Sequence, residues 1–316
     1  VMLLRYVITA LLLLWCSRAS AVSTLELDAA TRHIALNSVL EYREDATQSL
    51  DIDQIRAAGL DWQPSRSEVF NQGYSNSAWW LRLRIANSLP QTQQRLIELS
   101  YAVLDQLDVF VLDGEVPVKV YALGDKLPFA QRLLQHRFFL VPLEWQPGQT
   151  LDIYLRVRTS SAVQAPLSLW QRDAFSEFDS TRTLLHGLFF GTMLVIAVYN
   201  LLVYSVLREP TYLLYVGYVL CMPAFLGSLD GHAFRYLWPA ATHWNDQAII
   251  VFLSGVVFFS CAFTRRFLTL DIVQPHFNQA LKIISIVSVI MILAAFFVPY
   301  HLAIRALIPL ASFTCI

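Results

Sequence analysis

Apolar and polar side chains alternate along several short stretches between residues 23 and 175, and a period of two residues predicts β-strands. The clearest stretches are "RLIELS", "LDVFVLDG", "VPVKVYAL", "HRFFLVPLEWQPGQ" and "TLDIYLRVRTSS", with turn signals at Asp113-Gly114 and Pro147-Gly148. One short helix is expected at "DIDQIRAAG". A run of about 150 residues made of short strands is the size of a single sandwich. We therefore predict one β-sandwich domain over residues 23–175.

The stretch "SNSAWWLRLRIANS", residues 75–88, predicts a strand whose two faces differ. One face is wholly apolar and suits a core, whereas the other carries Trp80 and Arg82. The stretch "LDIYLRVR" repeats this pattern with Tyr154 and Arg156. An aromatic plane beside guanidinium groups suits a sugar ring, an anion or a partner protein.

If these two strands share a sheet, Trp80, Arg82, Tyr154 and Arg156 form a continuous platform, which we interpret as a candidate ligand-binding surface. His136 and Arg137, on a third strand, are further candidate contributors. The alternative is a solvated outer face on which arginine stems shield aromatic edges. The sequence leaves both interpretations open.

From residue 183 onward the pattern changes to long apolar runs. Residues 183–207 contain no charged side chain and are long enough to cross a bilayer core of about 30 Å. Further spans are expected at about 211–229, 247–264 and 281–300, and an incomplete fifth at 301–316. We therefore predict a transmembrane helix bundle over residues 183–316. Because the sequence stops within the fifth span, we expect the natural protein to continue beyond it.

Composition supports this division into two parts. Apolar residues make up 56% of the chain and charged residues 15%, whereas soluble proteins carry about 25% charged residues. Only 11 of the charged residues follow Thr181. The lipid bilayer is therefore an expected partner. The net charge of −1 gives no broad basic field, so nucleic acid is not expected as a partner.

The first 21 residues are typical of a secretory signal peptide. Arg5 precedes an apolar run, and Ala19-Ser20-Ala21 has the small-x-small pattern that a signal peptidase accepts. An uncleaved anchor helix is the alternative. The mature soluble part contains no cysteine, so neither a disulfide framework nor a thiolate zinc site is expected there.

Basic residues predict the orientation of the bundle. Arg208 follows the first span and Arg265-Arg266 follow the third, whereas the loop after the second span has only Arg235. Because basic loops stay in the cytoplasm, the first span runs from outside to inside. In a Gram-negative envelope this orientation makes the N-terminal domain periplasmic, and we then expect a bacterial inner-membrane protein.

A few residues of the helical half are candidates for packing or signalling. Gly187 and Gly191 form a small-xxx-small pattern that lets another helix approach, within the bundle or in a homodimer. Tyr199 and Asn200 place polar groups deep in the first span, where an amide needs a partner. Asp230 lies at the outer boundary of the second span, where interface solvation is the simplest explanation.

Two groups of motifs together resemble one known family. The stretches "LFFGTMLVIAVYNLLVYSVLREPTYLLYVGYVLCM", "DGHAFRYLWP" and "FTRRFL" resemble the membrane module of bacterial seven-transmembrane receptors with diverse intracellular signalling modules. The stretches "NQGYSNSAWWLRLRIANS", "LDQLDVFVLDG" and "HRFFLVPLEWQPG" resemble that family's second type of extracellular domain. Trp80 and Arg82 match the family's W-x-R strand, whereas Trp79 stands where a smaller residue is commoner.

The resemblance implies a jelly-roll β-sandwich similar to carbohydrate-binding modules, followed by a seven-helix bundle. It also implies a cytoplasmic output domain, often a diguanylate cyclase or a histidine kinase. The expected function is therefore a receptor that senses a periplasmic, carbohydrate-like small molecule or a partner protein.

No catalytic motif argues for an enzyme within these residues. Neither a phosphate-binding glycine loop nor a G-x-S-x-G elbow occurs, and the seven histidines are scattered without metal-ligand spacing. We expect no cofactor and no metal. A polytopic transporter, or an accessory protein with a periplasmic binding domain, is the alternative to a receptor. The first four spans offer only Asn200 and Pro223 for a midplane transport site.

Overall fold

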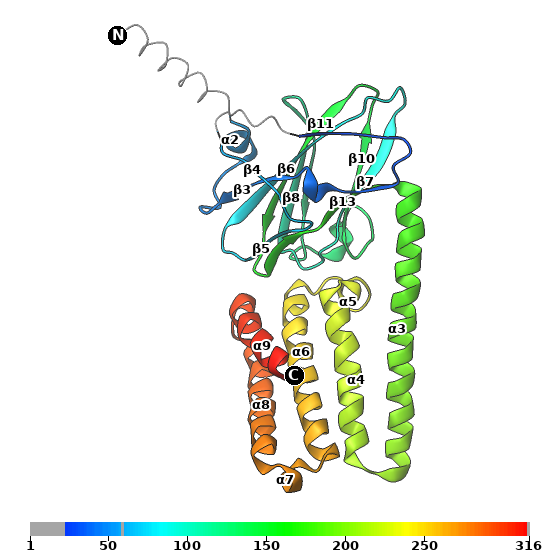
Figure 1. Ribbon diagram of the computed structural model, residues 1–316, viewed down its shortest axis with the longest axis vertical. Coiled ribbons are helices and arrows are strands. Elements are labelled where there is room, and N and C mark those ends of the chain that lie inside the picture. The colour runs from blue at the N-terminus through cyan, green and yellow to red at the C-terminus, as the bar shows by residue number, and fades with distance from the viewer. Residues whose placement is uncertain (1–22, 58–59, 315–316) are drawn as a thin grey trace, which may run out of the picture.

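The computed structural model describes residues 23–57 and 60–314. A β-rich domain spanning residues 24–171 stands above a group of long helices (Figure 1). This arrangement confirms the predicted fold class. The predicted signal peptide, residues 1–21, lies outside the described residues.

The β-rich domain contains two main sheets. In the larger sheet the order is β4, β3, β6, β11, β8 and β9, with β1 paired in parallel to β6; in the smaller sheet it is β10, β7, β13 and β2. Strands β12 and β5 form a separate pair. The bounds are β1 Thr24–Glu26, β2 His33–Ala35, β3 Glu41–Asp45, β4 Gln63–Pro64, β5 Phe70–Tyr74, β6 Ala78–Ala86, β7 Gln93–Leu99, β8 Gln106–Asp113, β9 Val116–Leu123, β10 Phe139–Trp145, β11 Thr150–Arg158, β12 Ala162–Ala165 and β13 Leu167–Gln171.

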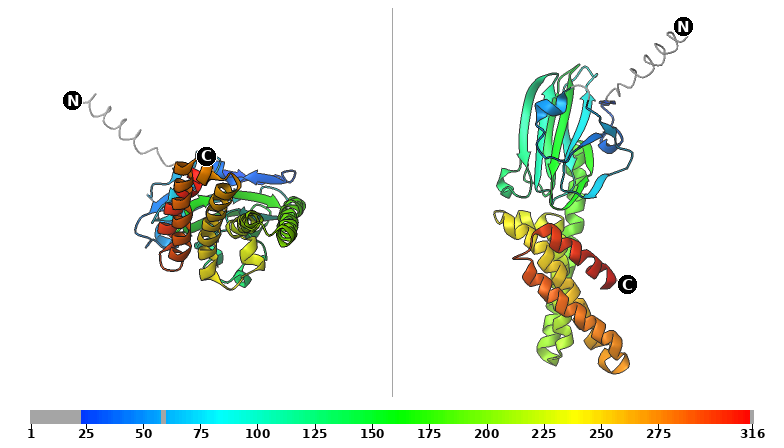
Figure 2. Two further views of the ribbon diagram at one scale, coloured as in Figure 1. Left: turned by 90° about the horizontal axis from the view of Figure 1, so that it is seen from below. Right: turned by 90° about the vertical axis from the view of Figure 1, so that its left-hand side faces the viewer.

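The two sheets face each other and bury the main core between them (Figure 2). Leu81 and Leu83 of β6 point into this core, as do Ile97 of β7 and Val141 of β10. Their alternation along the strands is the pattern that predicted the sandwich. Two one-turn 3-10 helices, η1 (Leu36–Ser38) and η2 (Phe129–Gln131), lie in connections between strands.

A short helix, α2 (Ile52–Arg56), covers the outer face of the larger sheet. Asp51 caps it, because its carboxylate accepts a hydrogen bond from the Gln54 backbone N–H at 2.8 Å while the Gln54 side chain accepts one from Asp51 N–H. The helix agrees with the expectation for this stretch. Gly59, the last residue of the stretch "DIDQIRAAG", is not among the described residues.

The helical half consists of α3 (Arg172–Leu207), α4 (Pro210–Leu229), α5 (His232–Tyr236), α6 (Thr242–Phe267), α7 (Leu270–Val273), α8 (Pro275–Ala294) and α9 (Tyr300–Thr314). Four of them, α3, α4, α6 and α8, are long and apolar enough to cross a membrane. They overlap the first four predicted spans, but α8 begins and ends six residues earlier than the predicted fourth span. Helix α9 coincides with the expected fifth span but has only 15 residues and contains Pro309.

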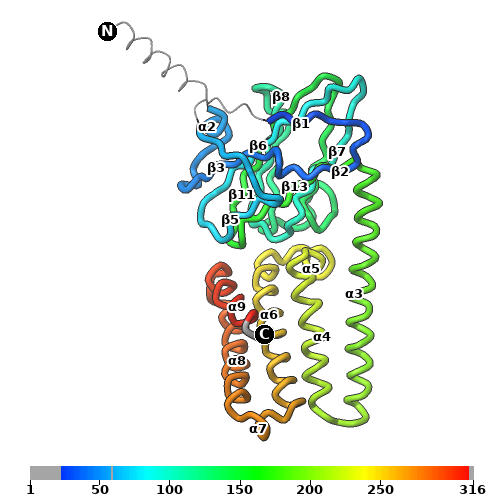
Figure 3. Tube along the Cα trace, in the orientation of Figure 1, coloured from blue at the N-terminus to red at the C-terminus, as the bar shows by residue number. Residues whose placement is uncertain are grey.

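Helix α3 begins at Arg172, directly after β13 and well before the predicted start of the first span at residue 183. Its 36 residues make it about 54 Å long, at about 1.5 Å per residue, which exceeds the thickness of a bilayer core. Its upper part stands beside the sandwich, and its lower part runs along α4 (Figure 3). One unbroken helix therefore connects the last strand to the membrane.

Candidate functional site

The four residues of the predicted platform do share a sheet. In the antiparallel pair β6 and β11, Tyr154 lies opposite Arg82 and Arg156 lies opposite Trp80. The platform is covered, however. Trp80 is 0% exposed and Tyr154 is 8% exposed, because both pack against Ile55 and Trp62 of the segment that contains α2.

The two guanidinium groups of the platform are also engaged by the protein. Arg82 Nε donates a hydrogen bond to Glu41 Oε2 at 2.5 Å, and the Arg82 guanidinium lies 4.4 Å from the centre of the Trp62 ring. Arg156 Nη2 donates to the backbone carbonyl of Gln48 at 2.5 Å. Both interpretations of the sequence assumed that this face is exposed. In the structure it is instead a second, smaller core. A ligand role for these residues stays a prediction and requires the covering segment to move.

His136 and Arg137 do not belong to that face. Their expected position on a third strand is wrong, because β10 begins only at Phe139 and both residues lie in the loop before it. This β9–β10 loop, residues 124–138, lies at the end of the sandwich that faces the helices. It packs against the connection between α4 and α6, residues 230–241, and the start of α6. We call this contact region the junction.

An apolar contact and a backbone hydrogen bond hold the middle of the junction. The Phe129 backbone N–H donates to the Pro239 carbonyl at 2.8 Å. The Phe129 ring meets Phe234 edge-on at 5.7 Å between ring centres. Arg132 lies over Phe129 at 4.7 Å. Burial lowers the pKa of Arg132 to about 10, although the nearby Asp125 carboxylate opposes this shift.

A lysine surrounded by carboxylates ties the loop to α6. Lys126 forms an ion pair with Asp246, and its Nζ lies 3.7 Å from Asp105 and 3.8 Å from Asp125. Asn245 donates to Asp125 Oδ2 at 3.3 Å. Burial raises the pKa of Asp125 to about 8; Lys126 lowers it, while Asp246 and Asp105 raise it further.

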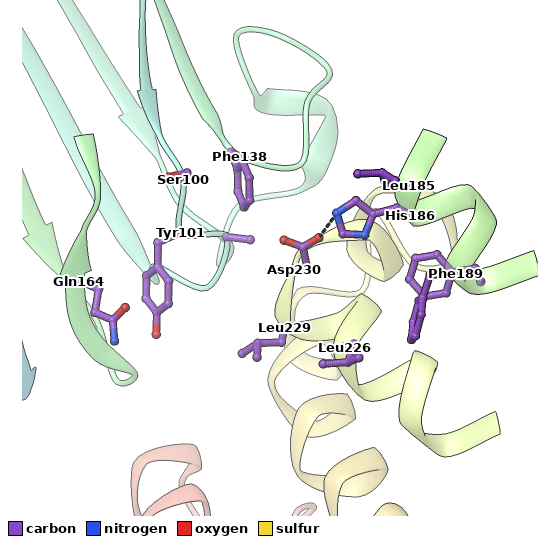
Figure 4. Close-up of a pocket in the computed structure, with 12 residues that line it drawn as sticks. Ser100, Tyr101, Phe138, Gln164, Leu185, His186, Phe189, Leu226, Leu229 and Asp230 are labelled. Carbon is purple, nitrogen blue, oxygen red and sulfur yellow. Dashed lines mark ion pairs between the residues drawn. The ribbon is translucent and has the colours of Figure 1, made fainter. Parts of the chain in front are cut away.

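Asp230 is the centre of a second polar cluster, where α4 ends. It forms an ion pair with Arg137 of the sandwich. His186 Nε2 of α3 lies 3.4 Å from Asp230 Oδ2 (Figure 4). His232 Nδ1 of α5 lies 3.1 Å from the same oxygen. Partial burial opposes ionisation of Asp230, but His232 and the Arg137 guanidinium outweigh it and hold the pKa of Asp230 below its usual value.

Gly231 allows the turn at Asp230 to approach the sandwich closely. Its φ of +79° is unfavourable for residues with a side chain. A Cβ atom there would also lie 2.8 Å from Ala102 Cβ and 2.9 Å from the Arg137 carbonyl oxygen. The turn therefore requires glycine for both conformation and space.

Two cavities adjoin the Asp230 cluster. One, of about 720 Å³, opens between the sandwich, α3 and α4, and its walls include Tyr101, Phe138, His186 and Asp230 (Figure 4). The other, of about 460 Å³, has His186 and His232 in its wall, together with apolar residues of α4 and α5. The cluster is thus accessible from cavities while it joins three parts of the molecule.

Side chains of the sandwich also contact the upper part of α3. His136 Nε2 lies 3.0 Å from Asp179 Oδ1. Arg182 donates to the nearly buried Glu98 of β7 at 3.1 Å. Both contacts lie above the apolar part of α3, so this helix is attached to the sandwich along its side as well as at its end.

The other candidates on α3 face outward or bond within their own helix. A Cβ atom at Gly187 or Gly191 would meet no atom within 4 Å, so no helix among the described residues packs on this pattern. Tyr199 is 64% exposed, and Asn200 Nδ2 donates to the Ile196 carbonyl of the same helix at 2.8 Å. Whether the glycine pattern makes a homodimer stays a prediction.

Sequence reasoning did not identify Asp125, Lys126, His186 or Asp246 as site residues. The local pattern offers little signal for them, because Asp125 and Lys126 lie in a turn, Asp246 lies near the start of a helix, and His186 is an isolated polar residue within α3. They become a site only where the β9–β10 loop meets the helices.

Comparison with family models gives two matches. Residues 37–171 match the model described as 7TMR-DISM extracellular 2, and residues 182–316 match the model described as 7TM diverse intracellular signalling. Together they cover most of the sandwich, apart from β1 and β2, and most of the helices that meet at the junction. A search of curated proteins found no match.

Proposed function

Because the chain belongs to the 7TMR-DISM receptors and is therefore a transmembrane sensory protein, we propose that its sandwich detects a periplasmic ligand or partner protein and that the junction relays the event. The receiving element is the helix bundle in the membrane. A cytoplasmic output domain, such as a diguanylate cyclase or a histidine kinase, completes the proposed pathway.

The observation that carries this proposal is the double attachment of the sandwich to the helices. Helix α3 continues from β13 without a break, and the Arg137–Asp230 and Lys126–Asp246 ion pairs attach the β9–β10 loop to α4 and α6. A displacement of the sandwich must therefore either move these helices or break polar contacts.

The junction has the incomplete pairing expected of a contact with two arrangements. Asp125 Oδ1, Arg132 Nε and Arg137 Nη2 are buried and have no hydrogen-bond partner among the described residues. A buried polar atom without a partner costs about 1–3 kcal/mol. A second arrangement that pairs these atoms would therefore lie close in free energy. A ligand shifts such an equilibrium only by the difference between its affinities for the two states.

A carbohydrate-like ligand on the predicted platform fits this scheme if the segment over the platform opens. The cover is a short segment, because α2 has only five residues and packs over Trp80 through Ile55, together with Trp62 and the partly buried Leu50, Ile52 and Leu60. Opening would expose Trp80 and Tyr154 beside Arg82 and Arg156, the residue types that stack on and hydrogen-bond to a sugar.

Charge-swap variants of the full-length protein in membranes test the relay. Arg137→Asp and Asp230→Arg each place like charges together, and both should shift the basal output, measured as nucleotide cyclisation or autophosphorylation. The double variant restores opposite charges and should return the output toward the wild-type level. Arg84→Asp, which places like charges together within the larger sheet, opposite Asp152 and away from the helices, is the matched control. Unchanged output in both single variants at normal membrane levels would contradict the relay.

A further inference from the structure

Three metal-ligating side chains meet at the corner between the sandwich and the helices. His186 comes from α3, Asp230 from the end of α4, and His232 from the start of α5. Their ligating atoms all lie within 4.8 Å of one another. In the sequence, His186 lies 44 positions before Asp230 and 46 positions before His232. Because of this separation, motif spacing did not reveal the group.

The separations fit a tetrahedral metal ion. His186 Nε2 and His232 Nδ1 lie 3.4 Å and 3.1 Å from Asp230 Oδ2. A tetrahedral ion with bonds of about 2.0–2.1 Å separates its ligand atoms by about 3.3 Å. Two imidazole nitrogens and one carboxylate oxygen favour Zn²⁺ and similar transition metals, whereas Ca²⁺ and Mg²⁺ prefer oxygen ligands alone.

A second, independent observation comes from His232. Its Nδ1 atom is buried and has no hydrogen-bond partner within the described part of the chain. It lies 3.1 Å from Asp230 Oδ2, with which it forms an ion pair when His232 is protonated. The cavities lined by His186, Asp230 and His232 give an ion a route to this position and room for a water ligand.

We propose that His186, Asp230 and His232 bind one divalent transition metal ion of the Zn²⁺ type. Arg137 Nη1 pairs with the same Asp230 oxygen that faces both histidines. A cation and a guanidinium group repel each other at this distance. The metal therefore competes with Arg137 and, on binding, detaches the β9–β10 loop from Asp230. This last consequence rests on the proposed relay, whereas metal binding itself does not.

A second group of potential metal ligands consists of Asp105, Asp125 and Asp246, but we do not expect it to bind a metal ion. The Lys126 ammonium group already lies among its carboxylates.

Titration of the chain in detergent micelles with Zn²⁺ alone, in competition with a chromophoric chelator, tests the site. Wild type should bind one equivalent that is lost in both His186→Gln and His232→Gln. The matched control is His276→Gln, which changes an exposed histidine of α8 far from the junction. Co²⁺ should give the visible absorption of a tetrahedral complex in wild type, and Ca²⁺ should not displace it.

Arg137→Gln separates a ligand site from a merely structural cluster. If Arg137 competes for Asp230, its removal should raise Zn²⁺ affinity about tenfold, the change expected when one charge-assisted hydrogen bond is lost. Equal Zn²⁺ binding by wild type and both histidine variants would overturn the site. So would reduced binding by a folded Arg137→Gln protein. If Zn²⁺ binds as expected but does not change the cyclisation or autophosphorylation activity of the full-length protein, the metal site stands and only the proposed relay is contradicted.

Discussion

At the scale of single residues, the junction combines buried charge with ion pairing. Asp125 is nearly inaccessible, yet Lys126, Asp105 and Asp246 all lie around it. The elevated pKa of Asp125 means that it holds a proton at neutral pH that it would release in an unfolded chain. One side chain therefore couples the stability of the junction to pH.

We expect Asp125 to make the protein less stable as pH rises from about 4 to about 8. In this window the folded chain retains a proton on Asp125, whose pKa is raised from 3.8 to about 8, and the unfolded chain does not. The free energy of unfolding therefore falls with increasing pH and levels off above the folded-state pKa.

Thermal unfolding midpoints in detergent at about pH 5 and about pH 8 check this. Asp125→Asn should reduce the difference between the two midpoints, because the amide cannot ionise. Asp53→Asn, on the exposed side of α2, should leave the difference as in wild type. An Asp125→Asn protein with an undiminished pH dependence would show that other groups cause it.

At the scale of elements, β6 is buried on both sides. Its Leu81 face points into the main core and its Trp80 face lies under the α2 segment. The alternation of aromatic and arginine residues on this face therefore reflects a second core. The aromatic rings are buried in it and the arginines lie at its rim, where Arg82 pairs with Glu41.

Trp80→Ala should destabilise the sandwich by about 3–5 kcal/mol, because it removes a fully buried aromatic ring that stacks on Phe110. Chemical denaturation, monitored by far-UV circular dichroism, measures this. Val120→Ala, at a 58% exposed position of β9 in the same sheet, should change stability by no more than about 0.5 kcal/mol. A loss no larger than that of Val120→Ala would mean that the cover is open in solution.

At the scale of the whole molecule, the length and apolar composition of the four long helices predict that the sandwich and the far ends of the helices lie on opposite sides of a membrane. The turn between β8 and β9 is at the outer end of the sandwich, and α7 is at the opposite end of the bundle (Figure 1). The basic residues near α7 predict that this end is cytoplasmic.

Single cysteines in a cysteine-free background test this orientation. A membrane-impermeant thiol reagent should label Glu115→Cys, in the β8–β9 turn, in intact spheroplasts. It should label Asp271→Cys, in α7, only after lysis. Both positions are exposed, so access depends on the membrane alone. The reverse labelling pattern would invert the topology and remove the basis for a periplasmic sensor.

The sequence by itself determined the division into a β domain and membrane helices. Strand alternation and long uncharged runs are local patterns, since each follows from the burial of neighbouring side chains. For the same reason, it identified β6 and β11 and the residues they place side by side. It also indicated four membrane helices, which the structure places with partly different ends.

Only the tertiary structure decided what those residues contact. Whether the Trp80 face is open depends on a segment that crosses it from elsewhere in the chain, and His136 and Arg137 belong to the junction because the β9–β10 loop meets Asp230 there. His186 and His232 lie far apart in sequence but have ring centres 4.6 Å apart. Such proximities arise when separate elements pack together, so no local pattern along the chain encodes them.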